Sequence, residues 1–155
     1  MLRLHLLRHA EPHVMGSFSS DKERSLSEYG RLQCETLKNN LNLDWSDITI
    51  WCSTANRTRE TALNLIQTSA FEEIEFKEEL YHATLGKLIG LISSYNGTKE
   101  LMIIGHNNGI TDFLNYLTGN ALVMKTGHYV CLEFPVDQWG EASLSVASVV
   151  HELVP

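Results

Sequence analysis

The sequence predicts an α/β fold of three layers, in which a mostly parallel central sheet with an antiparallel edge strand lies between two layers of helices. Strand-like and helix-like segments alternate up to residue 119, and the last two strand-like segments follow each other without a helix between them. The chain has 155 residues, the size of one domain, so we expect residues 1–155 to fold as a single unit. Hydrophobic residues make up 43% and charged residues 20%, a composition that is typical of globular proteins.

Six segments have the composition of strands. Leu2–Leu7 alternates at its start and then becomes fully apolar, and Glu100–Gly105 is an apolar run that ends in glycine. Buried strands of parallel sheets are short apolar runs of this kind, and β-branched or aromatic residues mark the others. The six predicted strands are Leu2–Leu7, Asp47–Cys52, Glu73–Phe76, Glu100–Gly105, Tyr129–Phe134 and Ser143–Val150.

Four helices are predicted from capping residues and from apolar residues at helical spacing. The expected caps are Ser27, then Ser53 or Thr54, then Thr84, and the fourth helix is expected to end at Gly119. The second helix is expected to run far enough for Leu63, Ile66 and Ala70 to share its inner face. The polar, turn-rich stretch His9–Arg24 is predicted to be a long loop, and loops of this length are commonly functional or mobile.

Charge and cysteine content exclude several classes of function. The net charge is −7 and the isoelectric point is near 5.4, whereas a nucleic-acid-binding domain carries a basic face. No apolar run approaches the roughly 18 residues of a membrane span, and the charged N-terminus does not fit a signal peptide. Cys34, Cys52 and Cys131 are far apart and odd in number, which is typical of reduced thiols. We therefore expect a cytoplasmic protein that binds neither nucleic acid nor a membrane.

Charged and imidazole side chains gather where the predicted parallel strands end. The residues that follow these four strands are Arg8 and His9, then Arg57, then Glu78 and Glu79, and finally His106. In open α/β sheets, ligands bind outside the carboxyl ends of the strands. We therefore expect two arginines, two histidines and two carboxylates to line one site.

Two arginines beside helix starts predict an anion site, because guanidinium groups bind phosphate oxygens in paired hydrogen bonds and helix N-termini add to the positive field. A neutral histidine in such a site can attack phosphorus and carry the phosphoryl group as phosphohistidine. The second histidine and the arginines would neutralise the phosphoryl oxygens, and a carboxylic acid would protonate the leaving group. Because the arginines would repel a cation, we expect no metal ion, and we expect this chemistry to need no organic cofactor.

Three segments at these positions resemble the motifs of one family. LLRHAE resembles the opening RHG or RHA motif of the histidine phosphatase superfamily, STANRTRETA resembles its SPxxRAxQTA segment, and IIGHNNGI resembles its VGHNPGI segment. The three stand in the family's order, and similarity in RSLSEYGR and TGHYVCLEF extends the resemblance over nearly the whole chain. The short length and the ELYHA segment look most like the SixA-type branch. The resemblance implies the phosphoglycerate mutase-like fold and a phosphohistidine phosphatase.

Carried over residue by residue, the resemblance implies a role for five side chains. His9 becomes the nucleophile, and His106 becomes the second histidine at the phosphate. Arg8 and Arg57 become phosphate ligands, and Arg24 becomes a residue that touches the substrate.

Two of the assignments leave alternatives open. Arg59 competes with Arg57, but Arg59 falls where the family motif is variable. Two residues further along a helix, it would also point about 200° away, so we choose Arg57. Relatives place a glutamate after the third strand as general acid, and by position this is Glu79, with Glu78 second and His82 third.

Four further histidines have no role assigned by the resemblance. His13 and His128 are candidates for the mouth of the pocket, whereas His5 and His151 are expected to be structural or at the surface.

The expected function is that of a metal-independent phosphatase that acts through a phosphohistidine intermediate on protein phosphohistidine. The third strand passes to the next helix in about eight residues, which indicates an uncovered pocket that admits a phosphorylated protein. Such a pocket would equally admit a small phosphoester, so a small-molecule phosphomonoesterase is one alternative. A non-catalytic phosphate-binding domain is another, although a pure binder has no need of His9 beside Arg8.

Overall fold

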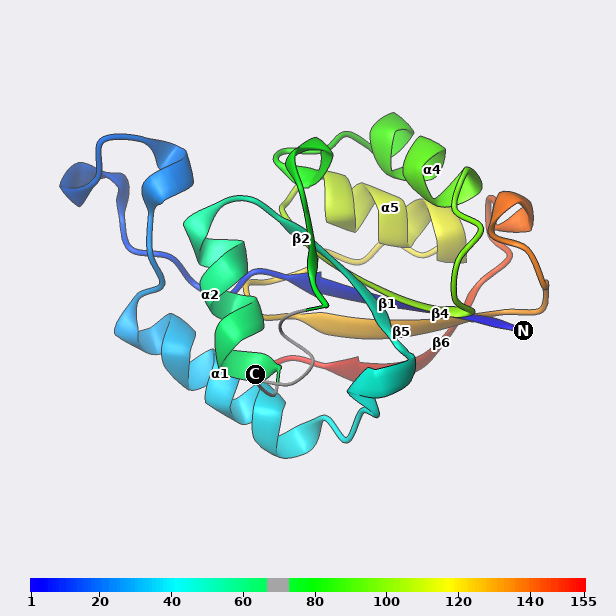
Figure 1. Cartoon of the computed structure of the whole chain (residues 1–155), viewed down its shortest axis with the longest axis horizontal. Coiled ribbons are helices and arrows are strands. Elements are labelled where there is room, and N and C mark those ends of the chain that lie inside the picture. The colour runs from blue at the N-terminus through cyan, green and yellow to red at the C-terminus, as the bar shows by residue number, and fades with distance from the viewer. Residues whose placement is uncertain (67–72) are drawn as a thin grey trace.

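The computed structural model describes residues 1–66 and 73–155, and within them six strands form one mixed sheet (Figure 1). The strands are β1 (Leu2–Arg8), β2 (Thr49–Ser53), β3 (Glu75–Lys77), β4 (Glu100–Gly105), β5 (Tyr129–Phe134) and β6 (Ser148–Leu153). Their order across the sheet is β3-β2-β4-β1-β5-β6. The first four pair in parallel, whereas β5 runs antiparallel to both β1 and β6. The antiparallel pairing thus lies at the β6 edge, and the predicted fold class is confirmed.

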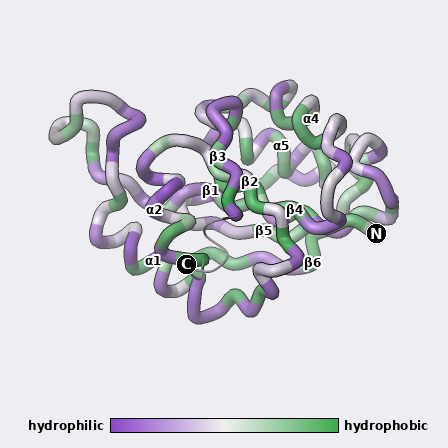
Figure 2. The backbone as a smooth tube through the Cα atoms, viewed as in Figure 1, coloured by the Kyte–Doolittle hydropathy of each residue, from purple (hydrophilic) through white to green (hydrophobic). Residues whose placement is uncertain are grey.

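Helices cover both faces of the sheet (Figure 1). They are α1 (Glu28–Asn40), α2 (Asn56–Leu65), α4 (Leu85–Ser93) and α5 (Gly109–Thr118). α1 and α2 pack together on one face, and α4 and α5 pack together on the other. Figure 2 shows hydrophobic residues along the strands and hydrophilic residues on the outer turns. No helix in the described ranges is long and apolar enough to cross a membrane.

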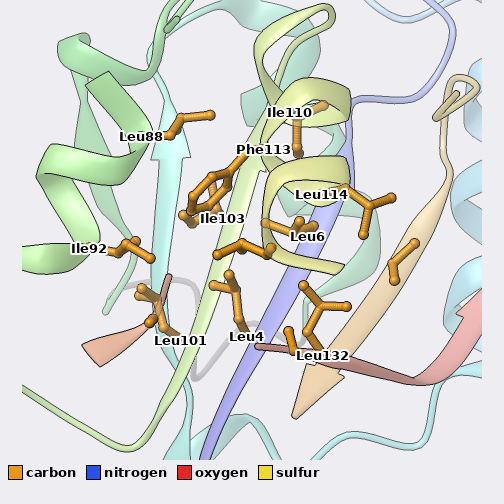
Figure 3. Packing of buried hydrophobic residues seen from close by; sticks show 14 of the residues in the cluster. Leu4, Leu6, Leu88, Ile92, Leu101, Ile103, Ile110, Phe113, Leu114 and Leu132 are labelled. Carbon is orange, nitrogen blue, oxygen red and sulfur yellow. The ribbon is translucent and has the colours of Figure 1, made fainter. Parts of the chain in front are cut away.

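Side chains of β4 alternate between two separate cores. Leu101 and Ile103 pack under α4 and α5, and Figure 3 shows Ile103 among residues of those helices and of β1. Met102 and Ile104 face the other way and pack against α1 and α2. Each fully buried side chain of this size contributes about 1.5–3 kcal/mol to folding. The two cores fix the sheet on both faces, so the ends of its strands form a rigid support for a site.

Three predicted helix termini are confirmed. The Ser27 side chain accepts a hydrogen bond from the backbone N–H of Gly30, and the Thr84 side chain accepts one from Lys87. Gly119 ends α5 in the left-handed conformation, with φ at 74°, which glycine adopts without strain.

The predictions for α2 are wrong at both ends. Its N-cap is Ala55, because Ser53 belongs to β2 and directs its hydroxyl elsewhere. The helix ends at Leu65, and Leu63 is exposed rather than on the inner face. The predicted contact of Ala70 lies outside the described residues.

The last strand begins later than predicted, at Ser148 instead of Ser143. Ser145 and Ala147 donate their backbone N–H groups to carbonyl oxygens at the end of α5. This segment therefore ties the helix to the sheet before β6 can pair with β5.

Candidate active site

The carboxyl ends of β1, β2 and β4 bring the predicted histidines and arginines together. Arg8 ends β1 beside Gly105 of β4, and the N–H of His9 donates to the carbonyl of Gly105 over 3.1 Å. The ring centres of His9 and His106 are 5.2 Å apart. Arg57 lies in the first turn of α2 and is 3% exposed. We call Arg8, His9, Arg57 and His106 the floor of the site.

His9 is held as a neutral imidazole. Its Nδ1 lies 2.7 Å from the carbonyl oxygen of Ala10, which can only accept, so Nδ1 carries the proton. Nε2 is left with its lone pair, and the Nε–H of Arg57 donates to it over 3.3 Å. Burial, with smaller contributions from Arg57 and Arg8, lowers the pKa of His9 to about 3. A deprotonated Nε2 at neutral pH is what a nucleophile requires.

His106 is held by the adjacent strand. Its Nε2 lies 2.7 Å from the hydroxyl oxygen of Ser53, the last residue of β2. Burial, followed by the proximity of His9 and Arg57, lowers the pKa of His106 to about 2. Both histidines of the floor are thus neutral at neutral pH, and the arginines supply its positive charge.

Arg8 is clamped by the segment that leads into β5. Its Nη1 donates to the carbonyl of Met124 over 2.9 Å, and the side chain of Asn107 donates to the same oxygen. Thr111 bonds both Asn107 and the N–H of Met124. The Nε of Arg8 is buried without a hydrogen-bond partner in the described part of the chain. This leaves Arg8 with a donor available for an anion.

A second group of side chains stands over the floor, and Asp21 is its centre. Asp21 begins the turn η2 (Asp21–Glu23) of the long loop. Its carboxylate accepts hydrogen bonds from Arg57 (3.0 Å), Arg24 (3.0 Å), Tyr81 (2.7 Å) and His82 (3.1 Å). Burial alone would raise the pKa of Asp21, but these four donors outweigh it and hold that pKa well below its usual range. We call Asp21, Arg24, Tyr81 and His82 the rim of the site.

The aromatic rings of the rim lie against the floor. The His82 ring centre is 5.2 Å from that of His106, and Tyr81 meets His106 edge-on at 5.5 Å. His82 has a backbone φ of 49°, a left-handed conformation that is uncommon outside glycine.

The rim corrects the expectation of an uncovered pocket. The connection from β3 to α4 is short, but cover comes from a different segment, the long loop that carries Asp21. His9 is only 5% exposed and His106 only 4%.

The predicted general acid is not brought to the floor. Glu78 and Glu79 lie in the turn η4 (Glu78–Leu80), whose last residue is buried in the core. Glu79 is exposed, and it makes no hydrogen bond, ion pair or ring contact with any residue in the described ranges. Glu78 binds Lys22 and Thr54 instead. His82, the third candidate, is the one that reaches the site.

The two candidate arginines make different contacts, and one of them contacts His9. Arg59 donates to the carbonyl of Thr54, and its guanidinium lies 4.4 Å from the ring centre of Phe76. Arg57 is the arginine that contacts His9.

The remaining histidines serve other contacts. His128, a candidate for the pocket mouth, is buried and bonds Glu152 of β6 over 2.8 Å. His13 is exposed and lies beside the ring of Phe18.

The described residues offer no ready metal site. His5, His9 and His13 recur at intervals of four, but β1 and the loop after it carry them to different partners. No group of three or more His, Cys, Asp or Glu side chains in the described ranges is arranged to hold a metal ion.

Asp21, Tyr81 and Ser53 are site residues that the sequence analysis did not assign. Asp21 lies in the stretch predicted as a functional or mobile loop, and Tyr81 lies within the ELYHA segment. Ser53 was considered only as a helix cap. Ser53 and Tyr81 lie within the STANRTRETA and ELYHA segments, whereas Asp21 lies three residues before RSLSEYGR.

Comparison with known proteins agrees with the arrangement of the strand ends. Residues 4–101, more than half of the chain, match the model of the histidine phosphatase superfamily, branch 1. An uncharacterised chloroplastic protein of Arabidopsis thaliana is 30% identical over 152 residues, which cover 90% of this chain and 70% of the relative.

Solved structures share the fold over its whole length. SixA of Agrobacterium tumefaciens has a TM-score of 0.79 at 24% identity, with 99% of this chain and 98% of that chain covered. A protein histidine phosphatase SixA solved with tungstate has a TM-score of 0.72 at 15% identity, with 98% and 96% covered. The strand-end residues, the family match and the shared fold lead to one conclusion: the chain belongs to branch 1 of the histidine phosphatase superfamily and is a phosphatase.

Proposed function

We propose that this phosphatase works through a phosphohistidine intermediate on His9, without a metal ion, and that its substrate is phosphohistidine on a protein. The hydrogen bonding of His9 is the observation that carries the mechanism. The carbonyl of Ala10 fixes the proton on Nδ1, so that Nε2 holds a lone pair 3.3 Å from the Nε of Arg57. A side chain that served only to bind an anion would gain from being charged, whereas burial keeps this one neutral.

In the first step, the lone pair of His9 Nε2 forms a bond to phosphorus while the bond from phosphorus to the leaving atom breaks. The leaving atom keeps the bonding electron pair and takes up a proton. Arg8 and Arg57 balance the charge on the phosphoryl oxygens. His106 lies beside these oxygens as the second histidine of the site. We propose that Arg24, bound to Asp21 at the rim, touches the outer part of the substrate.

In the second step, water attacks phosphorus and loses a proton. The phosphorus–nitrogen bond breaks, and its electron pair returns to His9 Nε2. Inorganic phosphate leaves, and the imidazole is neutral again. Shelter from water is not needed, because water is the second substrate.

Two observations support protein phosphohistidine as the substrate. The fold is that of SixA, one structure of which is described as a protein histidine phosphatase. The rim also presents the rings of Tyr81 and His82, against which an imidazole leaving group can stack.

A small phosphoester is the second candidate, and the burial of the floor favours it. His9 is 5% exposed and lies under a rim that includes a segment of the long loop. A nucleophile buried to this extent suits a small substrate better than a side chain on a folded surface. A phosphorylated protein and a small phosphoester therefore remain the two proposed partners, and the cytoplasmic location remains a prediction.

The test is a phosphatase assay in EDTA with a phosphohistidine-bearing protein and a panel of small phosphoesters. We expect activity to persist in EDTA and kcat/KM to be highest for the phosphohistidine protein. Loss of activity in EDTA would contradict the metal-free mechanism. A higher kcat/KM for a small phosphoester would replace the proposed substrate with the second candidate.

A further inference from the structure

We propose that His82 is the acid that protonates the leaving group when the substrate is a phosphoester, and that Asp21 is the residue that orients it. This inference rests on the phosphoryl transfer to His9 proposed above. It assigns to the rim a catalytic role that the sequence placed on Glu79.

The direction of attack points to the rim. In phosphoryl transfer the attacking and leaving atoms lie roughly in line on opposite sides of phosphorus. His9 attacks from the floor, so the leaving oxygen departs on the side away from it. The groups that adjoin the floor beside His9 are Asp21, Tyr81 and His82: Asp21 bonds Arg57, and both rings lie against His106.

Of these three groups, His82 is the one suited to give up a proton at neutral pH. Asp21 accepts from four donors and is ionised, so it has no proton to give. Tyr81 donates its hydroxyl to Asp21, and burial together with that carboxylate raises the pKa of the phenol further. The Nε2 of His82 faces Asp21, which leaves Nδ1 to meet a leaving group, and imidazole is the commonest general acid in enzymes.

The backbone of His82 is an independent observation. Its φ of 49° places a residue with a Cβ in the left-handed region, which costs about 1–3 kcal/mol and persists only where the surroundings impose it. Such residues cluster at active sites. Here the conformation accompanies an imidazole whose ring centre is 5.2 Å from His106 and whose Nε2 is 3.1 Å from Asp21.

The proposed step moves one proton from His82 to the leaving oxygen and one from water back to His82. His82 begins as an imidazolium, with its Nε2–H directed to Asp21. As the phosphorus–oxygen bond breaks, the leaving oxygen keeps the electron pair and takes the proton from Nδ1 of His82. When water attacks the phosphohistidine, neutral His82 takes a proton from it and becomes an imidazolium again. Each turnover thus consumes one water and returns both histidines to their starting states.

The test compares His82→Asn with Glu79→Gln on two esters. Asparagine tolerates a positive φ, so the loop keeps its shape, and Glu79→Gln, three residues earlier in the chain, is the control. A nitrophenolate departs without a proton, whereas an alkoxide needs one. We expect His82→Asn to lower kcat/KM for an alkyl phosphate about 10²-fold or more and to change that for 4-nitrophenyl phosphate less than about threefold. Glu79→Gln should change neither.

Three results would overturn the assignment. One is an equal loss on both esters in His82→Asn, which would mean a structural role. Another is no loss on either ester. The third is a selective loss on the alkyl ester in Glu79→Gln, which would return the role to Glu79.

A second variant covers the case in which His82→Asn folds poorly. His82→Gly also accepts a positive φ, and imidazole added to the solution should restore part of its activity on the alkyl phosphate. No restoration would count against His82 as an acid. A separate measurement tests the underlying mechanism. If that mechanism is wrong, wild-type protein will carry no acid-labile phosphoryl label after reaction with 4-nitrophenyl phosphate, whatever the role of His82.

Discussion

The floor and the rim of the site are built in different ways. Backbone pairing positions the floor, since His9 and His106 follow adjacent parallel strands and share the carbonyl of Gly105 as a neighbour. Side chains from the long loop and from the turn before α4 build the rim, and the carboxylate of Asp21 joins Arg24, Tyr81 and His82.

This difference separates phosphoryl transfer from proton exchange and substrate contact. The floor is buried and its histidines are neutral, so it suits attack on phosphorus and stabilisation of charge. The rim is half-buried to exposed and bears groups that can exchange protons or contact the substrate. Substitutions in the floor should therefore abolish phosphoryl transfer itself, whereas substitutions in the rim should change which substrates are hydrolysed.

The largest effect is expected for His9→Ala. Removal of the nucleophile should lower kcat by on the order of 10⁴-fold or more. The fold should survive, because His9 follows the end of β1 rather than lying within a core. Activity assays together with the thermal unfolding temperature check both statements. Substantial remaining activity in a folded variant would remove His9 from its role.

Arg57→Ala and Arg59→Ala form a matched pair in one helix. By analogy with the loss of one oxyanion donor, Arg57→Ala should cost about 2.7–4 kcal/mol of transition-state stabilisation, or about 10²–10³ in rate. Arg59 lies over Phe76, so its removal should leave kcat/KM within about threefold of wild type. A greater loss in Arg59→Ala would mean that the floor is assigned to the wrong arginine.

Gly109→Ala should disturb the junction between floor and rim. A Cβ at Gly109 would clash with the backbone oxygen of Ala83, directly after His82. Because a backbone atom cannot rotate away, we expect a loss of about 3 kcal/mol in unfolding free energy, the upper end for overpacking. Gly90→Ala in α4 is the control. Nothing lies within 4 Å of the added carbon there, so it should stabilise by about 0.5–1 kcal/mol. Urea denaturation measures both, and equal effects would contradict the close contact.

The pH dependence of stability should report the buried histidines. Burial lowers the pKa of His9 from 6.5 to about 3, so below pH 6.5 the unfolded chain takes up a proton that the folded chain does not. Stability is therefore lost as pH falls from 6.5 toward 3. At about pH 5 the loss is about 2 kcal/mol for this one group. The drop in unfolding free energy between about pH 7.5 and about pH 5 should be smaller by about 2 kcal/mol in His9→Asn. An unchanged drop would mean that His9 titrates normally in the folded state.

The sequence could predict the floor because its residues are fixed by local signals. Arg8 and His9 follow an apolar strand directly, and strand ends meet at one edge in any parallel sheet. Arg57 could be chosen over Arg59 because it matches the family motif, and helical geometry separates the two side chains. None of these inferences needed the path of a loop.

The rim could not be predicted because it depends on conformations that the sequence pattern does not specify. Glu79 and His82 are three residues apart, and the turn η4 buries Leu80 while leaving Glu79 exposed. The left-handed φ of His82 goes with an imidazole that meets His106 and Asp21. Asp21 lies in a loop and bonds Arg57, which is 36 residues further along the chain, and no periodic pattern predicts such a contact.

The central claim is that a phosphoryl group rests on His9 during turnover. Wild-type protein mixed with a labelled phosphoester and quenched in alkali should carry a label that acid releases and alkali does not, and peptide mapping should place it on His9. His9→Ala should carry none. A label stable to acid would indicate an ester on a hydroxyl group. Either that result or a label on a residue other than His9 would contradict the account.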